Sequence, residues 1–282
     1  MSHIPVMVRE VISYIVTDPY GVYVDATAGC GGHTKAILDA TSGRVIAIEW
    51  DRKSLAVLED ALQGYIKAGR LEIVCGSYAL LSSAIEGVEG VCGVLFDFGV
   101  SSFQLDDPSR GFSFRFQGPL DMRMSGDIQM TAGDLITSVS EEELFKILWR
   151  YGEERFAKRI ARAIKEYLPQ TTEELALVVR KVVPRARAHK HLARVFQALR
   201  IAVNDELNNI ERGLQEAVLC LVQGGRLVTL TYHSLEDRIV KHFGMGHSSL
   251  KVLTKRVVKP SKEEFQANPR ARSAKLRAFE KV

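Results

Sequence analysis

The chain lacks the features that mark secreted, membrane-spanning or disulfide-bonded proteins. None of its apolar stretches approaches the roughly 20 uninterrupted residues that a membrane helix needs. The first twenty residues lack a basic segment followed by an apolar one, so we expect no secretion signal. The four cysteines are far apart and form no CxxC pair, which favours reduced cytosolic thiols over disulfides or a zinc site. The seven histidines show no metal-ligand spacing. We therefore expect a cytoplasmic protein that holds no metal and does not associate with a membrane.

The sequence also lacks internal repeats and low-complexity tracts. Hydrophobic residues make up 46% of the chain and charged residues 26%, which excludes a disordered or fibrous protein. At about 100–200 residues per domain, 282 residues correspond to roughly two domains.

The net charge is small, but its distribution is uneven. The 38 basic and 34 acidic residues give +4 for the whole chain. Residues 146–200 hold 14 basic and 5 acidic residues, and residues 251–282 hold 10 basic and 3 acidic residues. A single basic segment is typical of solvated helix faces. Two basic segments in an otherwise acidic chain favour a polyanionic partner, because the neutralisation of phosphate charges dominates the affinity for nucleic acids.

The first third of the chain alternates short apolar runs with helical patterns. The runs lie at residues 22–24, 45–48, 71–75 and 91–96, with apolar positions at helical spacing between them. Continuous apolar strands separated by helices indicate a parallel sheet covered on both faces. After a helix near residues 205–222 and a turn at Gly224–Gly225, residues 226–232 and 276–282 are predicted to add two strands.

The pattern changes in the middle of the chain. Residues 105–130 are polar with little periodicity, and residues 141–203 show only helical patterns, with breaks at Pro169 and Pro184. We therefore predict an α/β fold with a mostly parallel, Rossmann-like sheet. Its domain, residues 1–106 and 205–282, is interrupted by an all-helical domain of residues 107–204.

A glycine loop and acidic strand ends suggest a ligand site. Gly29, Gly31 and Gly32 follow the first strand and open a helix, where backbone N–H groups can approach a ligand closely. Their GxGG spacing differs from the GxGxxG of dinucleotide sites. Glu49, twenty residues after Gly29, ends the second strand and Asp97 ends the fourth, on the edge where open α/β sheets bind ligands.

These acids fit a ligand with a ribose and a positive charge better than a diphosphate. S-adenosylmethionine has both features and carries no phosphate. A nicotinamide cofactor is the alternative, and the glycine loop alone does not separate the two. Taken alone, each of these acidic residues could also be an ordinary surface Asp or Glu without a ligand.

Longer strings resemble one protein family. They are Asp97-Phe-Gly-Val-Ser-Ser-Phe-Gln-Leu-Asp106, Arg110-Gly-Phe-Ser-Phe114, Pro119-Leu-Asp-Met-Arg-Met124, Tyr151-Gly-Glu-Glu-Arg-Phe-Ala-Lys-Arg-Ile160, Phe196-Gln-Ala-Leu-Arg-Ile201, His233-Ser-Leu-Glu-Asp-Arg238 and Asn268-Pro-Arg-Ala-Arg-Ser-Ala-Lys-Leu-Arg277. From His3 to the C-terminus the chain resembles the bacterial RsmH (MraW) family. The resemblance implies a class I methyltransferase with an inserted helical domain. It also implies S-adenosylmethionine-dependent methylation of a cytidine N4 amine in the decoding centre of 16S rRNA, in the 30S ribosomal subunit.

The resemblance also implies functional positions. Carried over residue by residue, it places the S-adenosylmethionine contacts at Gly31, Gly32, His33, Glu49, Tyr78, Asp97 and Gln104. Relatives usually have Asp at the position of Glu49, often Phe at Tyr78, and commonly Phe at Tyr232. Residues 191–196 lack a Pro and two Thr of the family pattern, which we expect to alter an RNA-contacting turn.

The cytosine amine is a poor nucleophile, because its lone pair is delocalised into the ring. A hydrogen-bond acceptor near the amine localises that lone pair, and Asp97 is the candidate catalytic acceptor. In the alternative interpretation Asp97 serves the cofactor. Phe98 either stacks on the target base or is an aromatic residue of the hydrophobic core. Arg110, Asp121 and Arg123 either cover the active site or form structural salt bridges.

The basic segments are predicted to hold rRNA. The candidate RNA-binding residues are Arg185, Arg187, Lys190 and Arg194. A non-catalytic ribosome-assembly factor that retains a methyltransferase fold is the alternative function. The sequence leaves open whether naked rRNA or a 30S particle is the substrate, and whether the chain is a monomer or a homodimer.

Overall fold

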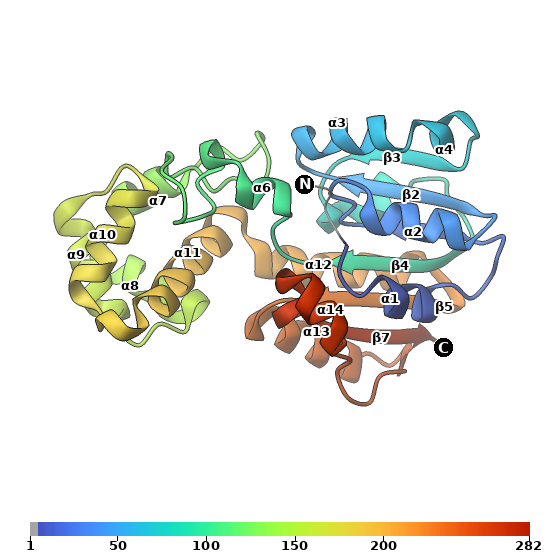
Figure 1. The fold of residues 1–282 in the computed structure, drawn as a ribbon. Helices are drawn as coiled ribbons and strands as arrows, with labels where there is room; N and C mark the ends of the chain where they lie inside the picture. The colour runs from blue at the N-terminus through green and yellow to red at the C-terminus, as the bar shows by residue number, and fades with distance from the viewer. Residues whose placement is uncertain (1–4) are drawn as a thin grey trace. The chain divides into compact units, whose positions relative to one another are not determined.

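The computed structural model describes residues 5–282, so His3 lies outside the described residues (Figure 1). The chain forms two compact units. One comprises the chain up to Gly99 together with Leu207–Val282, and the other, green to tan in Figure 1, comprises Val100–Glu206. No helix among the described residues is both long enough and apolar enough to cross a membrane.

The unit boundaries differ from those expected at residues 106 and 205. The short helix α6 (Ser102–Asp106) belongs to the inserted unit, because Val100 and Leu105 pack against the core of that unit. At the other end, Glu206 accepts two hydrogen bonds from Arg200 at 2.7 and 2.8 Å and therefore also stays with the inserted unit.

The larger unit is built on a seven-stranded sheet. Its strands are β1 (Val22–Asp25), β2 (Arg44–Glu49), β3 (Leu71–Cys75), β4 (Val91–Asp97), β5 (Leu221–Thr231), β6 (Leu250–Val252) and β7 (Lys275–Lys281). Their order is β3-β2-β1-β4-β5-β7-β6. The first five strands in this order are parallel, whereas β7 runs antiparallel to both β5 and β6. The predicted α/β fold with a mostly parallel sheet is confirmed.

Helices cover both faces of this sheet. They are α1 (Val8–Ile15), α2 (Gly32–Ala40), α3 (Arg52–Ala61), α4 (Gln63–Lys67), α5 (Leu81–Ala84), α12 (Glu206–Cys220), α13 (Ser234–Gly246) and α14 (Lys262–Ala267). Val45 and Ala47 of β2 pack in one core with α1, α2 and α3, whereas Ile46 and Ile48 pack in another with α5, α12 and α13. Because successive strand side chains point to opposite faces, a strand buried on both sides is apolar throughout.

The C-terminal part of the sheet holds two features that the sequence did not predict. β5 begins at Leu221, before the expected turn, and its pairing with β4 shifts between Val91 and Gly93. Gly224 has φ +80°, so the glycine pair forms a bulge within the strand. The short β6 and α14 were also missed, because three to six residues carry too little periodicity to predict an element.

The inserted unit is helical, as its periodicity predicted. After α6 it contains α7 (Ala132–Ser138), α8 (Glu141–Gly152), α9 (Ala157–Tyr167), α10 (Thr172–Val182) and α11 (Ala188–Asn204). The two predicted breaks are confirmed, since Pro169 lies between α9 and α10 and Pro184 lies between α10 and α11. Leu148, Ile160, Val179 and Leu199 are completely buried in its core, each contributing about 1.5–3 kcal/mol of hydrophobic stabilisation.

The polar segment before α7 is held by side-chain hydrogen bonds to its backbone. Arg110 Nη2 donates to the carbonyls of Arg123 and Met124 at 2.9 and 3.1 Å. Arg123 binds both oxygens of Asp121 at 2.8 and 2.9 Å. Asp121 and Arg123 thus form the expected salt bridge, whereas Arg110 binds backbone carbonyls. A position of these residues over the active site stays a prediction.

Gly93 in β4 lies where α1 packs closely on the sheet. A Cβ atom there would lie 2.6 Å from Ile15 Cγ1 and 2.9 Å from Tyr23 Cδ1. We expect Gly93→Ala to lower the free energy of unfolding by about 1–3 kcal/mol, because the core must shift to accommodate the methyl group. Urea unfolding followed by circular dichroism measures the change.

Gly64→Ala in α4 is the matched control, since a Cβ atom there meets nothing within 4 Å. We expect this variant to be at least as stable as the wild type, because alanine favours helix more than glycine does. Equal unfolding midpoints for the wild type and Gly93→Ala would contradict the described packing of α1 on β4.

Candidate active site at the carboxyl edge of the sheet

Acidic residues end three neighbouring strands of the sheet. Asp25 ends β1, Glu49 ends β2 and Asp97 ends β4. The strand order reverses between β1 and β4, because β2 lies on one side of β1 and β4 on the other. At such a switch point the connecting loops diverge and leave a crevice beyond the carboxyl ends of the strands, where ligands of open α/β sheets bind.

The glycine loop after β1 is fastened to the end of β2. Glu49 Oε2 accepts a hydrogen bond from the Gly29 N–H at 2.7 Å, and Oε1 accepts one from the Asp51 N–H at 2.6 Å. Gly29 has φ +55° and Gly31 has φ +89°, a backbone region that residues with a Cβ atom rarely adopt. A Cβ atom on Gly29 would meet nothing within 4 Å, so the loop leaves open space there.

The carboxyl group of Glu49 has an unusually high pKa. Burial raises the pKa of its carboxyl group to about 7, although the hydrogen bonds from Asp51 and Gly29 lower the pKa in part. The group therefore changes its charge near neutral pH.

Asp97 is held by groups from three other elements. Its backbone N–H donates to Thr27 Oγ1 at 2.6 Å, and its Oδ1 accepts a hydrogen bond from the Tyr232 hydroxyl at 2.7 Å. His33 Nδ1 in α2 lies 3.5 Å from Asp97 Oδ2. Burial raises the pKa of the Asp97 carboxyl group, and His33 and Tyr232 lower it in part.

His33 uses its side chain within the protein. The ring is buried, and its Nε2 lies 2.8 Å from the carbonyl oxygen of Val6. With its other nitrogen facing Asp97, the ring has both polar atoms engaged, which leaves the backbone as its route to a ligand.

Asp25 is a structural acid. It is completely buried, and its Oδ2 accepts a hydrogen bond from Thr34 Oγ1 at 2.7 Å. Burial raises the pKa of its carboxyl group. Asp25 thus ties the end of β1 to the first turn of α2.

Tyr78 belongs to an aromatic cluster near the ends of β3 and β4. Its ring packs edge-on against Phe96 and Phe98, with centroids 5.7 Å apart in both pairs. Phe98 is only 2% exposed and stacks on Phe96, so it is a core residue. Tyr78 is half-buried, which leaves part of its ring accessible.

Gln104 and the candidate RNA-binding residues lie in the inserted unit. Gln104 is buried and closes the capping box of α6, where its Oε1 accepts from the Ser101 N–H at 3.1 Å. Arg185, Arg187 and Lys190 are exposed. Arg194 is half-buried, and its Nη1 lies 3.9 Å from Oε2 of the buried Glu154.

The segment 191–196 is not a turn. It lies inside α11, where Leu192, Val195 and Phe196 pack in the core and His191 contacts Glu154 at 2.9 Å. The departures from the family pattern therefore lie within a packed helix.

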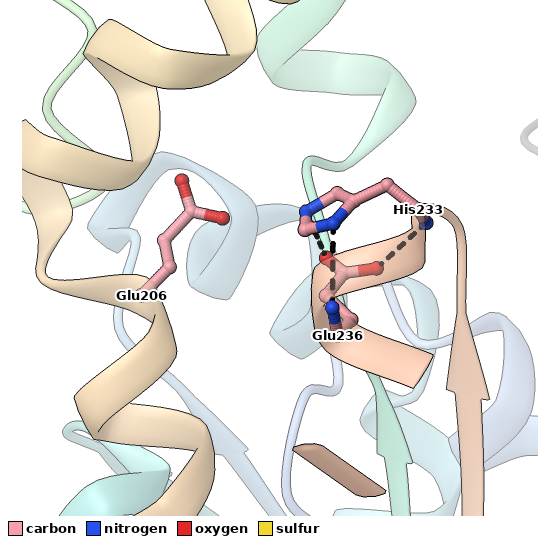
Figure 2. A group of neighbouring side chains, drawn as sticks. All are labelled: Glu206, His233 and Glu236. Carbon is pink, nitrogen blue, oxygen red and sulfur yellow. Dashed lines mark hydrogen bonds and ion pairs between the residues drawn. The ribbon is translucent and has the colours of Figure 1, made fainter. Parts of the chain in front are cut away.

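The residues after β5 cap a helix. Figure 2 shows the His233 ring beside Glu236 at the N-terminus of α13, where His233 and Glu236 form a capping box. Asp237 binds Lys275 at 3.1 Å and Arg277 at 2.8 Å, so part of the basic C-terminal segment is engaged inside its own unit. The sequence had singled out neither Thr27 nor the contact of Tyr232 with Asp97, since only the fold brings the ends of β1, β4 and β5 together.

Comparison with known proteins identifies the family. The model of the MraW methylase family matches residues 1–282. The chain belongs to this family. A ribosomal RNA small subunit methyltransferase H from Cyanothece sp. is 48% identical over 283 residues, covering 99% of this chain and 95% of the relative. Proteins of the same name from Kosmotoga olearia and Caldicellulosiruptor bescii are 46% and 43% identical, covering 100% of this chain and 98% and 99% of their own.

As a member of the MraW methylase family, the chain is an S-adenosylmethionine-dependent methyltransferase of small-subunit ribosomal RNA. The nicotinamide alternative is thereby wrong. The expectation of a metal-free protein stays a prediction.

The raised pKa of Glu49 predicts a pH-dependent stability. The folded protein keeps a proton on Glu49 up to about pH 7, whereas the ordinary pKa is 4.5. The contribution of Glu49 to the free energy of unfolding is therefore fully present below pH 4.5 and is lost as the pH rises through the pKa of Glu49 in the folded protein. Between about pH 4.5 and 7.5 we expect the wild type to lose about 2–3 kcal/mol relative to Glu49→Gln, which cannot ionise.

Urea unfolding at a series of pH values measures this difference. Glu59→Gln is the control, because Glu59 is an exposed residue of α3, and its curve is expected to run parallel to that of the wild type. If the Glu49→Gln curve is also parallel, Glu49 does not titrate near neutral pH.

Proposed function

We propose that the chain transfers a methyl group from S-adenosylmethionine to the N4 amine of a cytidine in the decoding centre of 16S rRNA. The observation that carries the proposal is the fastened glycine loop beside the carboxyl groups of Glu49 and Asp97, in a chain of the MraW methylase family. The reaction then takes place in the cytoplasm, where the ribosomal subunits are found.

The donor set fits S-adenosylmethionine. The two oxygens of a carboxylate accept about four hydrogen bonds, and Glu49 takes three from the backbone of Gly29, Trp50 and Asp51, so it keeps capacity for a ribose hydroxyl. The accessible part of the Tyr78 ring offers a stacking surface for adenine. Gly31, Gly32 and the backbone of His33 lie at the start of α2, where helix N–H groups attract a carboxylate.

Asp97 completes the proposed set of cofactor contacts within the larger unit. The Asp97 carboxylate supplies negative charge for the ammonium group of the methionine part, or an acceptor for the cytosine amine. The ammonium role requires the ionised form, whereas a carboxyl oxygen can accept from the amine in either form. Gln104 lies in the inserted unit and stays a predicted cofactor contact.

When bound, S-adenosylmethionine would supply an electrophilic methyl group whose transfer leaves the sulfur with the electron pair of the broken carbon–sulfur bond, and the amine proton would pass to solvent. The residues that would hold it are Gly31, Gly32, His33, Glu49, Tyr78 and Asp97. The protein contributes mainly by orienting the reactants, an effect worth about 7–11 kcal/mol when alignment is good. An acceptor at the amine adds electrostatic stabilisation as positive charge develops on nitrogen.

The basic residues of the inserted unit are proposed to hold the rRNA backbone. Arg185, Arg187 and Lys190 are exposed and lie within six residues of one another, and Arg194 follows on α11. The target cytidine leaves its stack to reach a site at the strand ends.

Methylation of rRNA tests the proposed activity. The purified chain is incubated with S-adenosylmethionine and either naked 16S rRNA or 30S subunits from cells that lack the protein, and N4-methylcytidine is measured by mass spectrometry. We expect one modified cytidine in the decoding centre. Asp97→Asn is expected to reduce the rate about 100-fold or more, because it removes the negative charge at the site.

Asp60→Asn is the matched control, since Asp60 is an exposed residue of α3. Its rate is expected to equal that of the wild type. No methylation of either substrate by the wild type, or a modified atom other than N4, would contradict the proposal.

The salt dependence of RNA binding tests the basic segment. The triple variant Arg185→Ala, Arg187→Ala and Lys190→Ala is expected to bind rRNA more weakly. The slope of log K against log salt should fall by about 2–3, since each phosphate contact contributes about 0.7–0.9. Filter binding at a series of salt concentrations measures both quantities.

The control removes the same charge from the other unit, with Arg9→Ala, Arg44→Ala and Lys67→Ala, all three exposed. If both triple variants change the slope equally, the contacts are not specific to the inserted unit.

A further inference from the structure

The Tyr232 hydroxyl is a dedicated donor to Asp97. Tyr232 follows directly after β5, and its hydroxyl donates to Asp97 Oδ1 at 2.7 Å. Burial and the neighbouring Asp97 raise the pKa of Tyr232 well above its ordinary value, so the hydroxyl keeps its proton and remains a donor. A donor to a carboxylate stabilises the ionised form of that carboxylate.

His33 faces the second oxygen of the same carboxyl group. A carbonyl oxygen only accepts hydrogen bonds, so the 2.8 Å contact with Val6 requires a proton on His33 Nε2. Nδ1 of the same ring lies 3.5 Å from Asp97 Oδ2, and the interaction with His33 lowers the pKa of Asp97. The ring is fixed in this position because it is buried.

Other charged groups oppose the ionisation of Asp97. Burial has the largest effect and raises the pKa of Asp97, and the carboxyl groups of Asp25 on β1 and Glu236 on α13 raise it further. Glu264 on α14 acts differently, because it raises the pKa of the Tyr232 hydroxyl and so helps that hydroxyl remain a donor. His33 and Tyr232 are the groups whose interaction favours the carboxylate.

We propose that Tyr232 and His33 are positioning residues that clamp the two oxygens of the buried Asp97 carboxyl group and favour its ionised form. This inference rests on the proposed function for what the carboxylate serves, the ammonium group or the amine. Since a carboxylate binds an ammonium group and accepts from an amine more strongly than a neutral carboxyl group does, we expect the clamp to move the acidic limit of activity to lower pH.

Titration of Asp97 tests the clamp without using the activity. The full-length protein is labelled with ¹³C at the aspartate carboxyl groups, and the Asp97 signal is identified by its loss in Asp97→Asn. We expect the midpoint of Asp97 in Tyr232→Phe to lie at least about one pH unit above that of the wild type, because a hydrogen bond to the ionised form is lost. His33→Gln is expected to shift the midpoint in the same direction.

Tyr23→Phe is the matched control. Tyr23 is a buried tyrosine of β1 whose hydroxyl binds the backbone of Asp18. The same loss of a buried hydroxyl there is expected to leave the Asp97 midpoint unchanged. This separates a specific effect on Asp97 from a general loss of stability.

The pH profile of methyl transfer gives the second measurement. In Tyr232→Phe the acidic limb of kcat/KM is expected to move to higher pH by the same amount as the NMR midpoint, with rates near those of the wild type above the limb. A uniform loss at every pH, or coincident Asp97 titrations in the wild type, Tyr232→Phe and His33→Gln, would overturn the clamp. A shifted titration in a protein without methyltransferase activity would support the clamp and contradict the proposed function.

Discussion

The hydrogen bonds that Glu49 accepts from Gly29 and Asp51 are the contacts on which the shape of the site depends. Two glycines with positive φ give the loop after β1 a course that other residues rarely adopt. Glu49 secures that course by joining the loop to the end of β2. The cost is a carboxyl group in a poorly solvated position, which is why its pKa is raised to about 7. The conformation of the loop after β1 and the charge of the site therefore both depend on the Glu49 side chain.

The same coupling extends across the switch point of the sheet. Thr27, in the glycine loop, accepts a hydrogen bond from the Asp97 backbone, so the loop after β1 is joined to the end of β4 as well. Asp97 in turn contacts α2 through His33 and the end of β5 through Tyr232. A network of this kind, in which each buried polar group has a partner, is rigid and holds reacting groups in place without reorganisation.

Much of the architecture was predictable, because it follows from periodicity. Both faces of the parallel strands are buried, so apolar runs at residues 45–48 and 91–96 identified β2 and β4. Helical spacing identified α2, α3 and the helices α8 to α11 of the inserted unit. The boundaries of that unit were displaced, because α6 is five residues long and joins the inserted core through Leu105, a contact that no local pattern encodes.

Strand-end acids were identifiable from their positions, but their different environments were not. Asp25 accepts a hydrogen bond from Thr34, Glu49 accepts hydrogen bonds from backbone N–H groups, and Asp97 accepts one from Tyr232, a residue 135 positions away in the sequence. Likewise, residues 191–196 resembled an altered turn in the sequence, whereas packing places them within a continuous helix. Sequence patterns report which faces are buried, and long-range side-chain contacts require the fold.

The most direct test of the account is a crystal structure of the chain with S-adenosylhomocysteine, the product that retains the adenosine and methionine parts. The account predicts a ribose hydroxyl within hydrogen-bond distance of the Glu49 carboxylate, adenine against Tyr78, and the sulfur facing the crevice beside Asp97. Adenosine density elsewhere in the molecule, or a ribose without contact to Glu49, would contradict it.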